Sequence, residues 1–284
     1  MPQLPPSLSA SSGADRPAAL SPPLVDLVGL RILGGLALAG ALATWGARAL
    51  WELRRPPYEL AEIVRHLYDI GWRSAPLITT AGLAIGVVLS MHTRASLERF
   101  GAEAMIPAGL AVALVRETGP LTAGLLAAGR VGAGIGAELA AMRVTEQIDA
   151  LEASAVDAFK FLAVPRILAC MIAMPILTTL MNAGGVLGGF LAERAASQMS
   201  WSLYIDRSFS LIGFADLLPA TLKTIVFGFI IGVTSSYLGF AASQGTEGVG
   251  RASTRSVVLG SILLILSNVI LVRIIFFWYP QVGR

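Results

Sequence analysis

Five long apolar runs constrain the fold of this chain more than any other feature of its sequence. Each is long enough to cross a bilayer, which takes about 20 helical residues. The runs cover residues 75–95, 105–128, 161–191, 217–242 and 257–278. The chain is 55% hydrophobic and only 14% charged, whereas soluble domains contain roughly 25% charged residues. The sequence therefore predicts an all-α polytopic membrane protein with five transmembrane helices.

The region before these runs is expected to contain a tail and an interfacial helix. Residues 1–23 are rich in Pro, Ser and Ala and lack a basic start followed by an apolar core, so we expect disorder rather than a cleaved signal peptide. Residues 32–47 form an apolar run between Arg31 and Arg48. A helix of about 16 residues falls short of a roughly 30 Å hydrocarbon core. We therefore expect an interfacial helix within residues 24–56, with a short sixth span as the alternative.

The basic residues predict the orientation of the chain. With five spans and a cytosolic N-terminus, eleven of them fall on the cytosolic side: Arg16, Arg31, Arg48, Arg54, Arg55, Arg65, Arg73, Arg143, Lys160, Arg251 and Arg255. Five fall on the opposite side: Arg94, Arg99, Arg194, Arg207 and Arg284. Because Lys and Arg favour cytosolic loops, the N-terminus is predicted inside and the C-terminus outside. The net charge of +3 is small and the basic residues are scattered along the chain, which argues against nucleic acid as a partner.

Small residues recur every four positions along the second run. The repeat consists of Gly124, Ala128, Gly132, Gly136 and Ala140. Helices in lipid associate through close backbone approach at such ridges, because burial of apolar side chains gives no driving force there. The repeat predicts a helix–helix interface, within the chain or across a dimer. The helix is expected to continue beyond its apolar part to about residue 142.

Charged residues interrupt this helix at membrane depth. Arg116 and Glu117 stand mid-span, close to Pro120, which removes a backbone hydrogen bond and can kink the helix. An ionisable group at this depth is costly, so it faces the bundle interior or a cavity and marks function. Two roles are open for the pair: lining a central cavity, or only holding neighbouring helices together. Arg130 and Glu138, near the cytosolic end, are expected to pair with neighbouring loops.

An acidic segment with helical spacing lies between the second and third runs. Thr145 suits the N-cap of a helix, and Glu146 suits its first turn. Glu146, Asp149 and Glu152 share one face, while Leu151 belongs to the apolar face. The pattern predicts a short amphipathic helix on the cytosolic side. It is either a solvated connection or a docking helix for a soluble partner.

Motifs for nucleotide hydrolysis, metal binding and nucleophilic catalysis are missing from the sequence. The only lysines, Lys160 and Lys223, belong to no G-x-x-x-x-G-K-[ST] loop. His66 and His92 stand outside any metal-ligand spacing, and a single cysteine, Cys170, allows neither an intramolecular disulfide nor a thiolate cluster. No G-x-S-x-G elbow is present. We therefore expect a chain that is not an enzyme and holds no cofactor or metal.

Two separated motifs resemble those of the MlaE/YrbE permease family. The first contains R-E-T-G-P, A-G-R-V-G and A-E-L-A-A-M-R-V-T-E-Q-I-D-A-L-E, followed by Val156-Asp157 and Pro165-Arg166. The second is G-V-G-R-A-S-T-R-S-V-V, at residues 248–258. The resemblance covers about residues 57–278 and departs at Ala158, where the family usually has proline. Residues 57–284 are then expected to form a permease domain of this type.

The resemblance implies a permease subunit of an ABC transporter that acts as a homodimer in the bacterial inner membrane. Such permeases work with a separate cytosolic ATPase, which binds ATP and Mg, and with a periplasmic MCE-domain protein. They move phospholipids or other large hydrophobic molecules between the inner membrane and the outer envelope. The family fold, five spans preceded by an interfacial helix, agrees with the count from the sequence.

Candidate site residues follow from the resemblance and from the chemistry of the side chains. The coupling helix that docks on the ATPase would contain Thr145, Glu146, Gln147, Asp149, Leu151 and Glu152. The lipid cavity or dimer interface would contain Arg116, Glu117 and Pro120. A second cytosolic loop, with Arg251, Thr254 and Arg255, would contact the docking helix or lipid phosphates. Gly124, Gly132 and Gly136 are the helix-packing positions.

A proton- or ion-coupled secondary transporter is the alternative function. It would use Glu117 as its ion site, because this carboxylate stands at membrane depth. Secondary transporters often contain inverted repeats and more than five spans. The sequence shows no internal repeat, which favours the permease.

Overall fold

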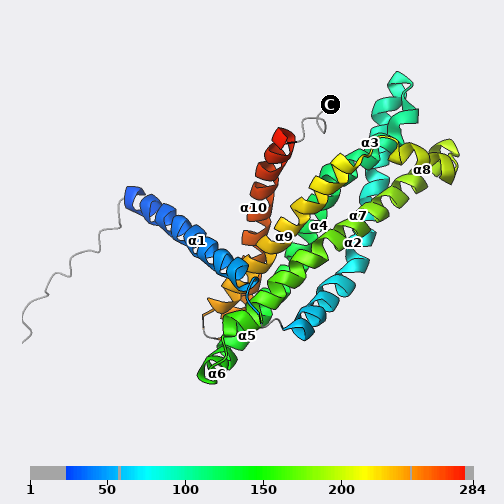
Figure 1. Cartoon of the computed structure of the whole chain (residues 1–284). Coiled ribbons are helices and arrows are strands. Elements are labelled where there is room, and N and C mark those ends of the chain that lie inside the picture. Colours follow the sequence, from blue (N-terminus) through cyan, green and yellow to red (C-terminus); the bar gives the residue numbers. More distant parts are fainter. Residues whose placement is uncertain (1–23, 57–58, 244, 279–284) are drawn as a thin grey trace, which may run out of the picture. The chain divides into compact units, whose positions relative to one another are not determined.

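The computed structural model describes residues 24–56, 59–243 and 245–278, and within these ranges every regular element is a helix (Figure 1). The disordered tail predicted for residues 1–23 lies outside the described residues. The chain divides into two compact units, residues 1–41 and 42–284. Within the described ranges, six helical stretches are long and apolar enough to cross a membrane. The predicted all-α polytopic fold is confirmed.

The first helix, α1, is longer than the apolar run indicated. It covers Leu24–Glu52, 29 residues, and so continues past Arg48. The Arg48 guanidinium lies 3.0 Å from the Asp157 carboxylate and 4.3 Å from the centre of the Phe159 ring. By length and composition, Leu33–Glu52 is a candidate span. Length therefore does not exclude the short sixth span, and the interfacial position stays a prediction.

Five longer helical stretches correspond to the five predicted runs, and the fourth run ends two residues beyond its helix. Three are single helices: α2 (Leu60–Leu97), α9 (Phe214–Phe240) and α10 (Thr246–Trp278). A fourth, Phe159–Ser197, begins with a π-helical turn at Phe159–Ala163 and continues as α7 (Val164–Ser197). The other, Glu103–Val144, consists of α3 (Ile106–Ala113), α4 (Gly119–Ala127) and α5 (Ala133–Val144), joined by π-helical turns at Leu114–Thr118 and Ala128–Gly132. The predicted continuation of this span to about residue 142 is confirmed.

The N-terminal part of α2 shows why the helices extend beyond the apolar runs. Asp69 and Arg73 pair at 3.3 Å one turn apart, and Glu62 and Arg65 pair at 3.6 Å. Such pairs support a helix where hydropathy is low. Hydropathy therefore locates each span without giving its ends.

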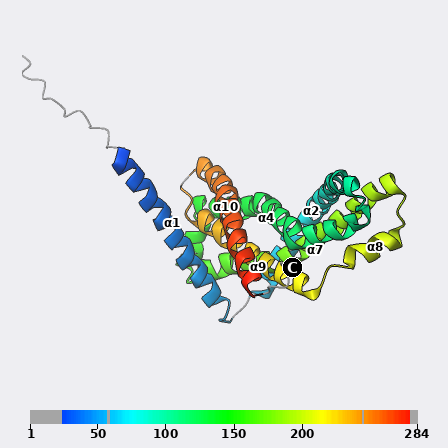
Figure 2. The ribbon, with the colours of Figure 1, turned by 90° about the horizontal axis from the view of Figure 1, so that it is seen from above.

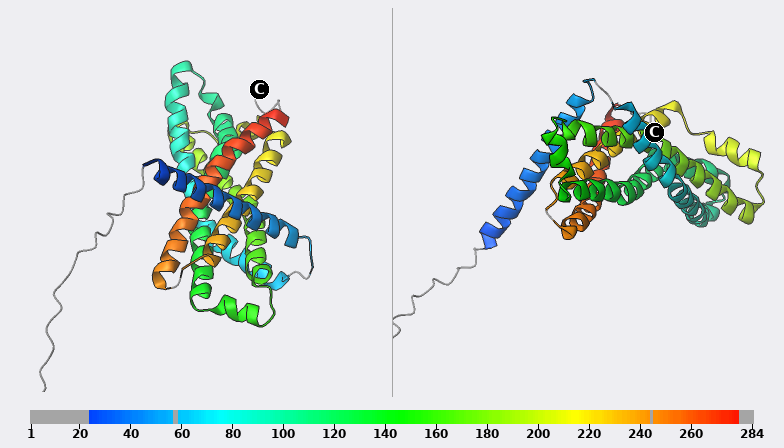
Figure 3. Two further views of the ribbon diagram at one scale, coloured as in Figure 1. Left: turned by 90° about the vertical axis from the view of Figure 1, so that its left-hand side faces the viewer. Right: turned by 90° about the horizontal axis from the view of Figure 1, so that it is seen from below.

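In the second unit, α7 packs along α2 on one side and along α9 on the other, and α10 packs on α9 and α5. Figures 2 and 3 show this bundle from above, from the side and from below. Short helices lie at its two ends. α6 (Gln147–Ala153) follows α5 at one end, and α8 (Trp201–Phe209) follows α7 at the other (Figure 1).

Glycines allow the closest approaches between these helices. A Cβ atom added at Gly188 of α7 would overlap the Leu83 carbonyl of α2. The predicted ridge of the second span faces α9 and α10 of the same chain. A Cβ at Gly124 would come within 2.7 Å of Leu264, one at Gly132 within 3.1 Å of Ser235 Oγ, and one at Gly136 would overlap Ser256 Oγ. These ridge positions are therefore occupied by contacts within the chain.

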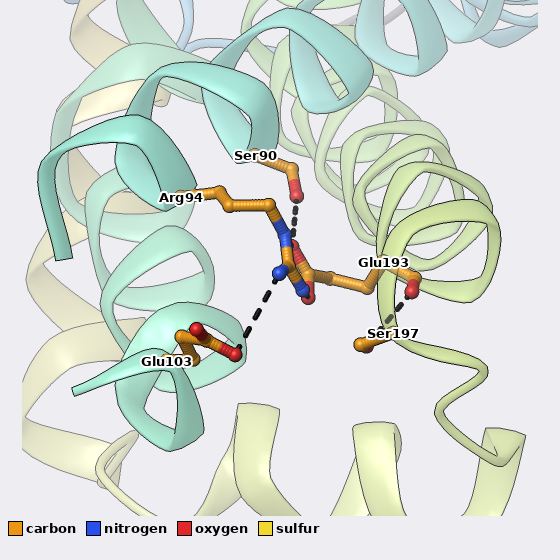
Figure 4. A network of polar contacts seen from close by, with 5 residues as sticks. All are labelled: Ser90, Arg94, Glu103, Glu193 and Ser197. Carbon is orange, nitrogen blue, oxygen red and sulfur yellow. Dashed lines mark hydrogen bonds and ion pairs between the residues drawn. The ribbon is translucent and has the colours of Figure 1, made fainter. Parts of the chain in front are cut away.

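A polar network fixes the bundle at the α8 end (Figure 4). Glu193 of α7 is 1% exposed, and its carboxylate accepts hydrogen bonds from Arg94 at 2.5 Å and from Ser90 at 2.9 Å, both on α2. Arg94 also lies 3.7 Å from Glu103, at the start of the second span. Ser197 Oγ donates to the Glu193 carbonyl at 2.9 Å. Three helical stretches are thus tied together by one buried carboxylate and one arginine.

Tyr204 anchors α8 to the bundle. Its side chain is fully buried and its ring centre lies 5.5 Å from that of Phe190 on α7. Burial raises the pKa of the Tyr204 hydroxyl to about 12. The amphipathic helix α8 therefore packs through a neutral phenol, which places Trp201 and Phe209 on its partly exposed side.

Candidate functional site

A π-helical turn brings opposite charges together in the middle of the second span. The turn Leu114–Thr118 contains Arg116 and Glu117. Pro120 follows in the first turn of α4 and has no backbone N–H to donate. Single π-helical turns within α-helices frequently mark functional sites, because they change the direction in which side chains point.

Arg116 pairs with the start of α9. Its Nε donates to Asp216 Oδ1 at 2.8 Å, and Asp216 is only 8% exposed. The other Asp216 oxygen accepts a hydrogen bond from the Gly213 N–H at 3.0 Å. The carboxylate thus closes the N-terminus of α9, where the helix dipole also favours negative charge. The Asp216 side chain therefore both caps the N-terminus of α9 and pairs with the Arg116 guanidinium of the second span.

Lys223 of α9 forms the second pair. Its Nζ donates to Glu117 Oε1 at 2.9 Å and to the Arg116 carbonyl at 2.7 Å. Pro120, four positions later, has no N–H to donate to that carbonyl. The other Glu117 oxygen accepts a hydrogen bond from Asn268 Nδ2 of α10 at 3.2 Å. The network therefore joins the second span to both α9 and α10.

The network stands at the edge of apolar space. The Lys223 side chain is 1% exposed, whereas that of Glu117 is 45% exposed. Arg116 and Glu117 line a cavity of about 60 Å³. Lys223 also borders a cavity of about 260 Å³ between α9 and α10, whose other walls include Leu222 and Trp278. Arg116 and Glu117, the exposed members of the network, can contact the polar head of an amphiphile while its apolar part lies against these walls.

The structure brings Arg116, Glu117 and Pro120 together, as the sequence suggested for this segment. It adds three residues that the sequence reasoning did not assign: Asp216, Lys223 and Asn268. The rule that ionisable residues at membrane depth mark function applies equally to Lys223 within the run 217–242. Asn268 gives a weaker signal of the same kind, as a polar residue in the last run.

The predicted docking segment forms α6. Ile148 is 1% exposed, whereas Glu146, Asp149 and Glu152 are exposed. Arg143, in the last turn of α5, forms an ion pair with Asp149 and ties α6 to the bundle. Two carboxylates, Glu146 and Glu152, remain at an exposed surface, which suits an electrostatic contact with a soluble protein.

The predicted N-cap of this helix is wrong. α6 begins at Gln147, and the residue before it is Glu146, whose φ is 59°. Thr145 belongs to the end of α5, where its Oγ1 donates to the carbonyl four residues earlier at 2.9 Å and accepts a hydrogen bond from Gln147 Nε2 at 3.0 Å. This local bond competes with capping. The apolar side of α6 is formed by Ile148 and Leu151, which pack on the core.

The second predicted cytosolic loop is helical. α10 begins at Thr246, so Arg251, Thr254 and Arg255 lie in its first turns and are exposed. Arg251 pairs with Glu247 one turn earlier, and Thr254 Oγ1 donates to a carbonyl of α10 at 3.0 Å. The i,i+4 pair stabilises a helix where a loop was expected. The polar contacts described for Arg251 and Thr254 stay within α10, and a contact with lipid phosphates remains a prediction.

Arg130 and Glu138 pair with helices rather than loops. Arg130 Nη1 donates to Ser74 Oγ of α2 at 2.6 Å. Glu138 lies 2.8 Å from Arg166 of α7. Both contacts connect the second span to its neighbours and support a structural role. Among the described residues, no group of three His, Cys, Asp or Glu side chains is placed to hold a metal ion.

Comparison with known proteins gives a consistent result. Residues 63–274 match the family model described as Permease MlaE. A probable ABC transporter permease protein of Rickettsia felis is 40% identical over 222 residues, which cover 78% of this chain and 86% of that protein. The intermembrane phospholipid transport system permease protein MlaE of Haemophilus influenzae is 33% identical over 218 residues, 75% of this chain and 82% of that protein.

A more distant relative is the chloroplastic protein TRIGALACTOSYLDIACYLGLYCEROL 1 of Arabidopsis thaliana, 28% identical over 208 residues, 73% of this chain and 59% of that protein. The family match includes the central network, α6 and the first turns of α10. It covers well over half of the chain, and the bacterial relatives match over most of their own length. The chain therefore belongs to the MlaE family of ABC transporter permeases.

Proposed function

We propose that this permease moves phospholipids or similar hydrophobic molecules between the inner membrane and the outer envelope. ATP hydrolysis belongs to a separate subunit, because the permease is the membrane component of an ABC transporter. The observation that carries the proposal is the charge network of Arg116, Glu117, Asp216 and Lys223 at the edge of an apolar cavity.

A phospholipid has the chemistry that this site would accept. Its phosphate accepts charge-assisted hydrogen bonds from arginine and lysine, and the amine of a zwitterionic headgroup can donate to a carboxylate. Its acyl chains match the leucine, valine and isoleucine side chains that line the cavity beside Lys223. The relative from Haemophilus influenzae, named for phospholipid transport, supports the same substrate class.

Exposed surfaces support two of the proposed partners. α6, with Glu146 and Glu152 exposed, would dock on a cytosolic ATPase. α10 exposes much of its apolar side, including Leu266 at 57% and Val269 at 65%, which suits a second copy of the chain or lipid. A periplasmic MCE-domain protein would complete the transporter. The permease would then lie in the bacterial inner membrane with α6 in the cytosol.

The same placement orients the termini. α10 begins at the α6 end of the bundle and ends at Trp278 toward the opposite end (Figure 1). With α6 in the cytosol, the C-terminus is periplasmic. The N-terminus is cytosolic if α1 lies in the interface, as we propose. A reporter enzyme that is active only in the periplasm is therefore expected to show no activity when it is fused to the N-terminus.

Geometry gives no support to ion-coupled transport through Glu117. Both oxygens of its carboxylate accept hydrogen bonds, one from Lys223 and the other from Asn268. An adjacent ammonium already balances the charge that a coupling ion would have to balance. The carboxylate is therefore placed as a member of a fixed network.

Purification from native membranes in mild detergent tests the proposal. Mass spectrometry should find a soluble ATPase, an MCE-domain protein and bound phospholipid with the tagged chain. Glu117→Gln then separates the two roles of the network: intact assembly with lost ATP-dependent lipid transport indicates the cavity role, and lost assembly indicates bracing. Glu247→Gln, at an exposed pair on α10, is the matched control. Transport driven by a proton gradient without ATP would overturn the proposal.

A further inference from the structure

A closed turn joins the docking helix α6 to the third span. Ala155, two residues after the end of α6, has a φ of 59°. Its N–H donates to the Glu152 carbonyl at 3.0 Å, and the N–H of Val156 donates to the Leu151 carbonyl at 3.1 Å. This pair of hydrogen bonds closes a helix behind a residue in the left-handed region. Alanine keeps that conformation only where surrounding contacts hold it, so α6 is joined to Asp157 by a turn of defined geometry.

Asp157 lies at the start of the third span and pairs with α1. Its Oδ1 atom accepts a hydrogen bond from the Lys160 N–H at 3.2 Å, and its carbonyl accepts one from the Phe161 N–H at 2.9 Å. Arg48 Nη2 donates to both carboxylate oxygens, at 3.0 and 3.3 Å. A charge-assisted hydrogen bond from a guanidinium fixes direction as well as distance. The Asp157 carboxylate therefore joins the residue behind the α6 turn to the last part of α1.

The part of α1 that contains Arg48 packs on the same short segment. It belongs to the same compact unit as α6 and α7. The ring centre of Trp45 lies 4.7 Å from that of Phe159, and the Arg48 guanidinium lies 4.3 Å from the centre of the same Phe159 ring. Lys160 Nζ donates to the Pro56 carbonyl, just after α1, at 3.3 Å. The end of α1 therefore contacts the start of the third span through an aromatic pair, a cation–π contact, an ion pair and a hydrogen bond.

The exposure of the Arg48–Asp157 pair separates its geometric effect from its effect on stability. The two side chains are 49% and 47% exposed, and pairs with this exposure contribute little to stability because water solvates both partners. The packing of Trp45 on Phe159 does not depend on the pair. The pair fixes where the Asp157 carboxylate lies relative to α1. Its removal should therefore loosen the segment behind α6 while the bundle stays folded.

We propose that Arg48 is a positioning residue for ATP-driven transport. It holds Asp157, and through the closed turn behind α6 it makes the docking helix and the end of α1 move as one body when the ATPase changes conformation. The ATPase then acts on α1 as well as on the third span. This inference rests on the proposed docking of the ATPase at α6, and it adds a route by which ATP hydrolysis reaches the first helix of the chain.

Spin-label distances test the positioning directly. Leu50→Cys on α1 and Ala153→Cys at the end of α6 place one label on each side of the pair, because both side chains are exposed. The natural Cys170 is 1% exposed, so the labels attach to the introduced cysteines. In the transporter purified from native membranes and diluted with unlabelled copies, we expect one narrow distance distribution. Arg48→Gln should broaden it, whereas Arg54→Gln, the same loss of charge at an exposed site two residues after α1, should not. An unchanged distribution in Arg48→Gln would overturn the proposal.

Asp157→Asn is the reciprocal variant. Asparagine can still accept the hydrogen bond from the Lys160 N–H, so the start of the span is kept while the charge of the pair is lost. Arg48→Gln and Asp157→Asn should each retain the ATPase and unfold within about 4 °C of the unchanged protein. The phospholipid moved per ATP hydrolysed by the reconstituted complex should fall about two- to thirtyfold, the range for residues that modulate coupling between sites. Because both variants remove one interaction, the double variant should lose no more than the more impaired single variant.

The outcomes distinguish this inference from the proposed function. Unchanged transport per ATP in both single variants, or additive losses in the double variant, would overturn the positioning role and leave phospholipid transport standing. Loss of the ATPase from either single variant would show that the pair is needed for docking itself, which also overturns the positioning role. If the unchanged complex moves no phospholipid with ATP, the proposed function is refuted and this inference falls with it.

Discussion

The contribution of the Glu117–Lys223 pair to stability can be tested with the two single variants and the double variant. The two side chains differ in exposure, so removing one partner has a different cost from removing the other. Of the Lys223 side chain 1% is exposed, against 45% for Glu117. Glu117→Gln leaves a buried ammonium with neutral acceptors only. Removing one partner of a fully buried pair costs about 3–5 kcal/mol of stability. Here Glu117 is partly solvated and Lys223 keeps its hydrogen bond to the Arg116 carbonyl, so we expect a cost of about 2–3 kcal/mol.

Lys223→Met has a different cost. It removes the hydrogen bond that the Lys223 ammonium donates to the Arg116 carbonyl, and a hydrogen bond to a charged group is worth about 1.5–3 kcal/mol. In the double variant both charges are gone, so mainly the carbonyl cost remains. The double variant should therefore be about 2 kcal/mol more stable than the sum of the single effects predicts. At about 2–4 °C per kcal/mol, Glu117→Gln lowers the unfolding temperature by about 4–12 °C and Lys223→Met lowers it by about 3–12 °C.

The assay is thermal unfolding of the four proteins, followed by tryptophan fluorescence in one detergent at one protein concentration. The control cycle uses Glu247→Gln and Arg251→Met, an exposed pair on α10, whose coupling should stay below about 0.5 kcal/mol. The double variant at Glu117 and Lys223 should unfold no lower than the less stable single variant. Additive effects, within about 0.5 kcal/mol, would refute the pair as a unit of the native bundle.

Three further predictions concern other parts of the molecule. Replacing both Glu146 and Glu152 with Lys should abolish co-purification of the ATPase and leave membrane insertion unchanged; stoichiometric ATPase on the variant would rule out docking at α6. Gly188→Ala should destabilise the bundle by about 1–3 kcal/mol through overlap with a carbonyl of α2. Gly134→Ala has no atom within 4 Å of the new Cβ and should stabilise by about 0.5–1 kcal/mol; equal unfolding temperatures would contradict the contact. Glu193→Gln should lower stability by about 3 kcal/mol or more, because it leaves the guanidinium of α2 without its buried partner. An unfolding temperature equal to that of the unchanged protein would show that this network does not stabilise the α8 end of the bundle.

The sequence predicted the spans well because hydrocarbon imposes one dominant requirement, a long apolar helix. It failed where local interactions decide the structure. The ends of α2 depend on pairs such as Asp69 with Arg73, which hydropathy does not weigh. Thr145 looked like a cap because its side chain can bond a backbone N–H, but it bonds the α5 carbonyl behind it instead. A single sequence contains both possibilities, and packing of Ile148 on the core decides between them.

The central network shows the same limit more sharply. Pro120 alone shows that the α-helical donor four positions after Arg116 is missing, and buried carbonyls are nearly always hydrogen-bonded. The sequence thus poses the question, but the answer, Lys223, depends on which helix lies beside the π-helical turn. That neighbour is set by backbone contacts such as Gly228 of α9 against Cys170 of α7. Glycines four residues apart occur in several spans, and each such pair would allow a different arrangement of neighbouring helices. The charged residues could therefore be recognised as functional from the sequence, whereas their partners follow only once glycine packing has fixed the order of the helices.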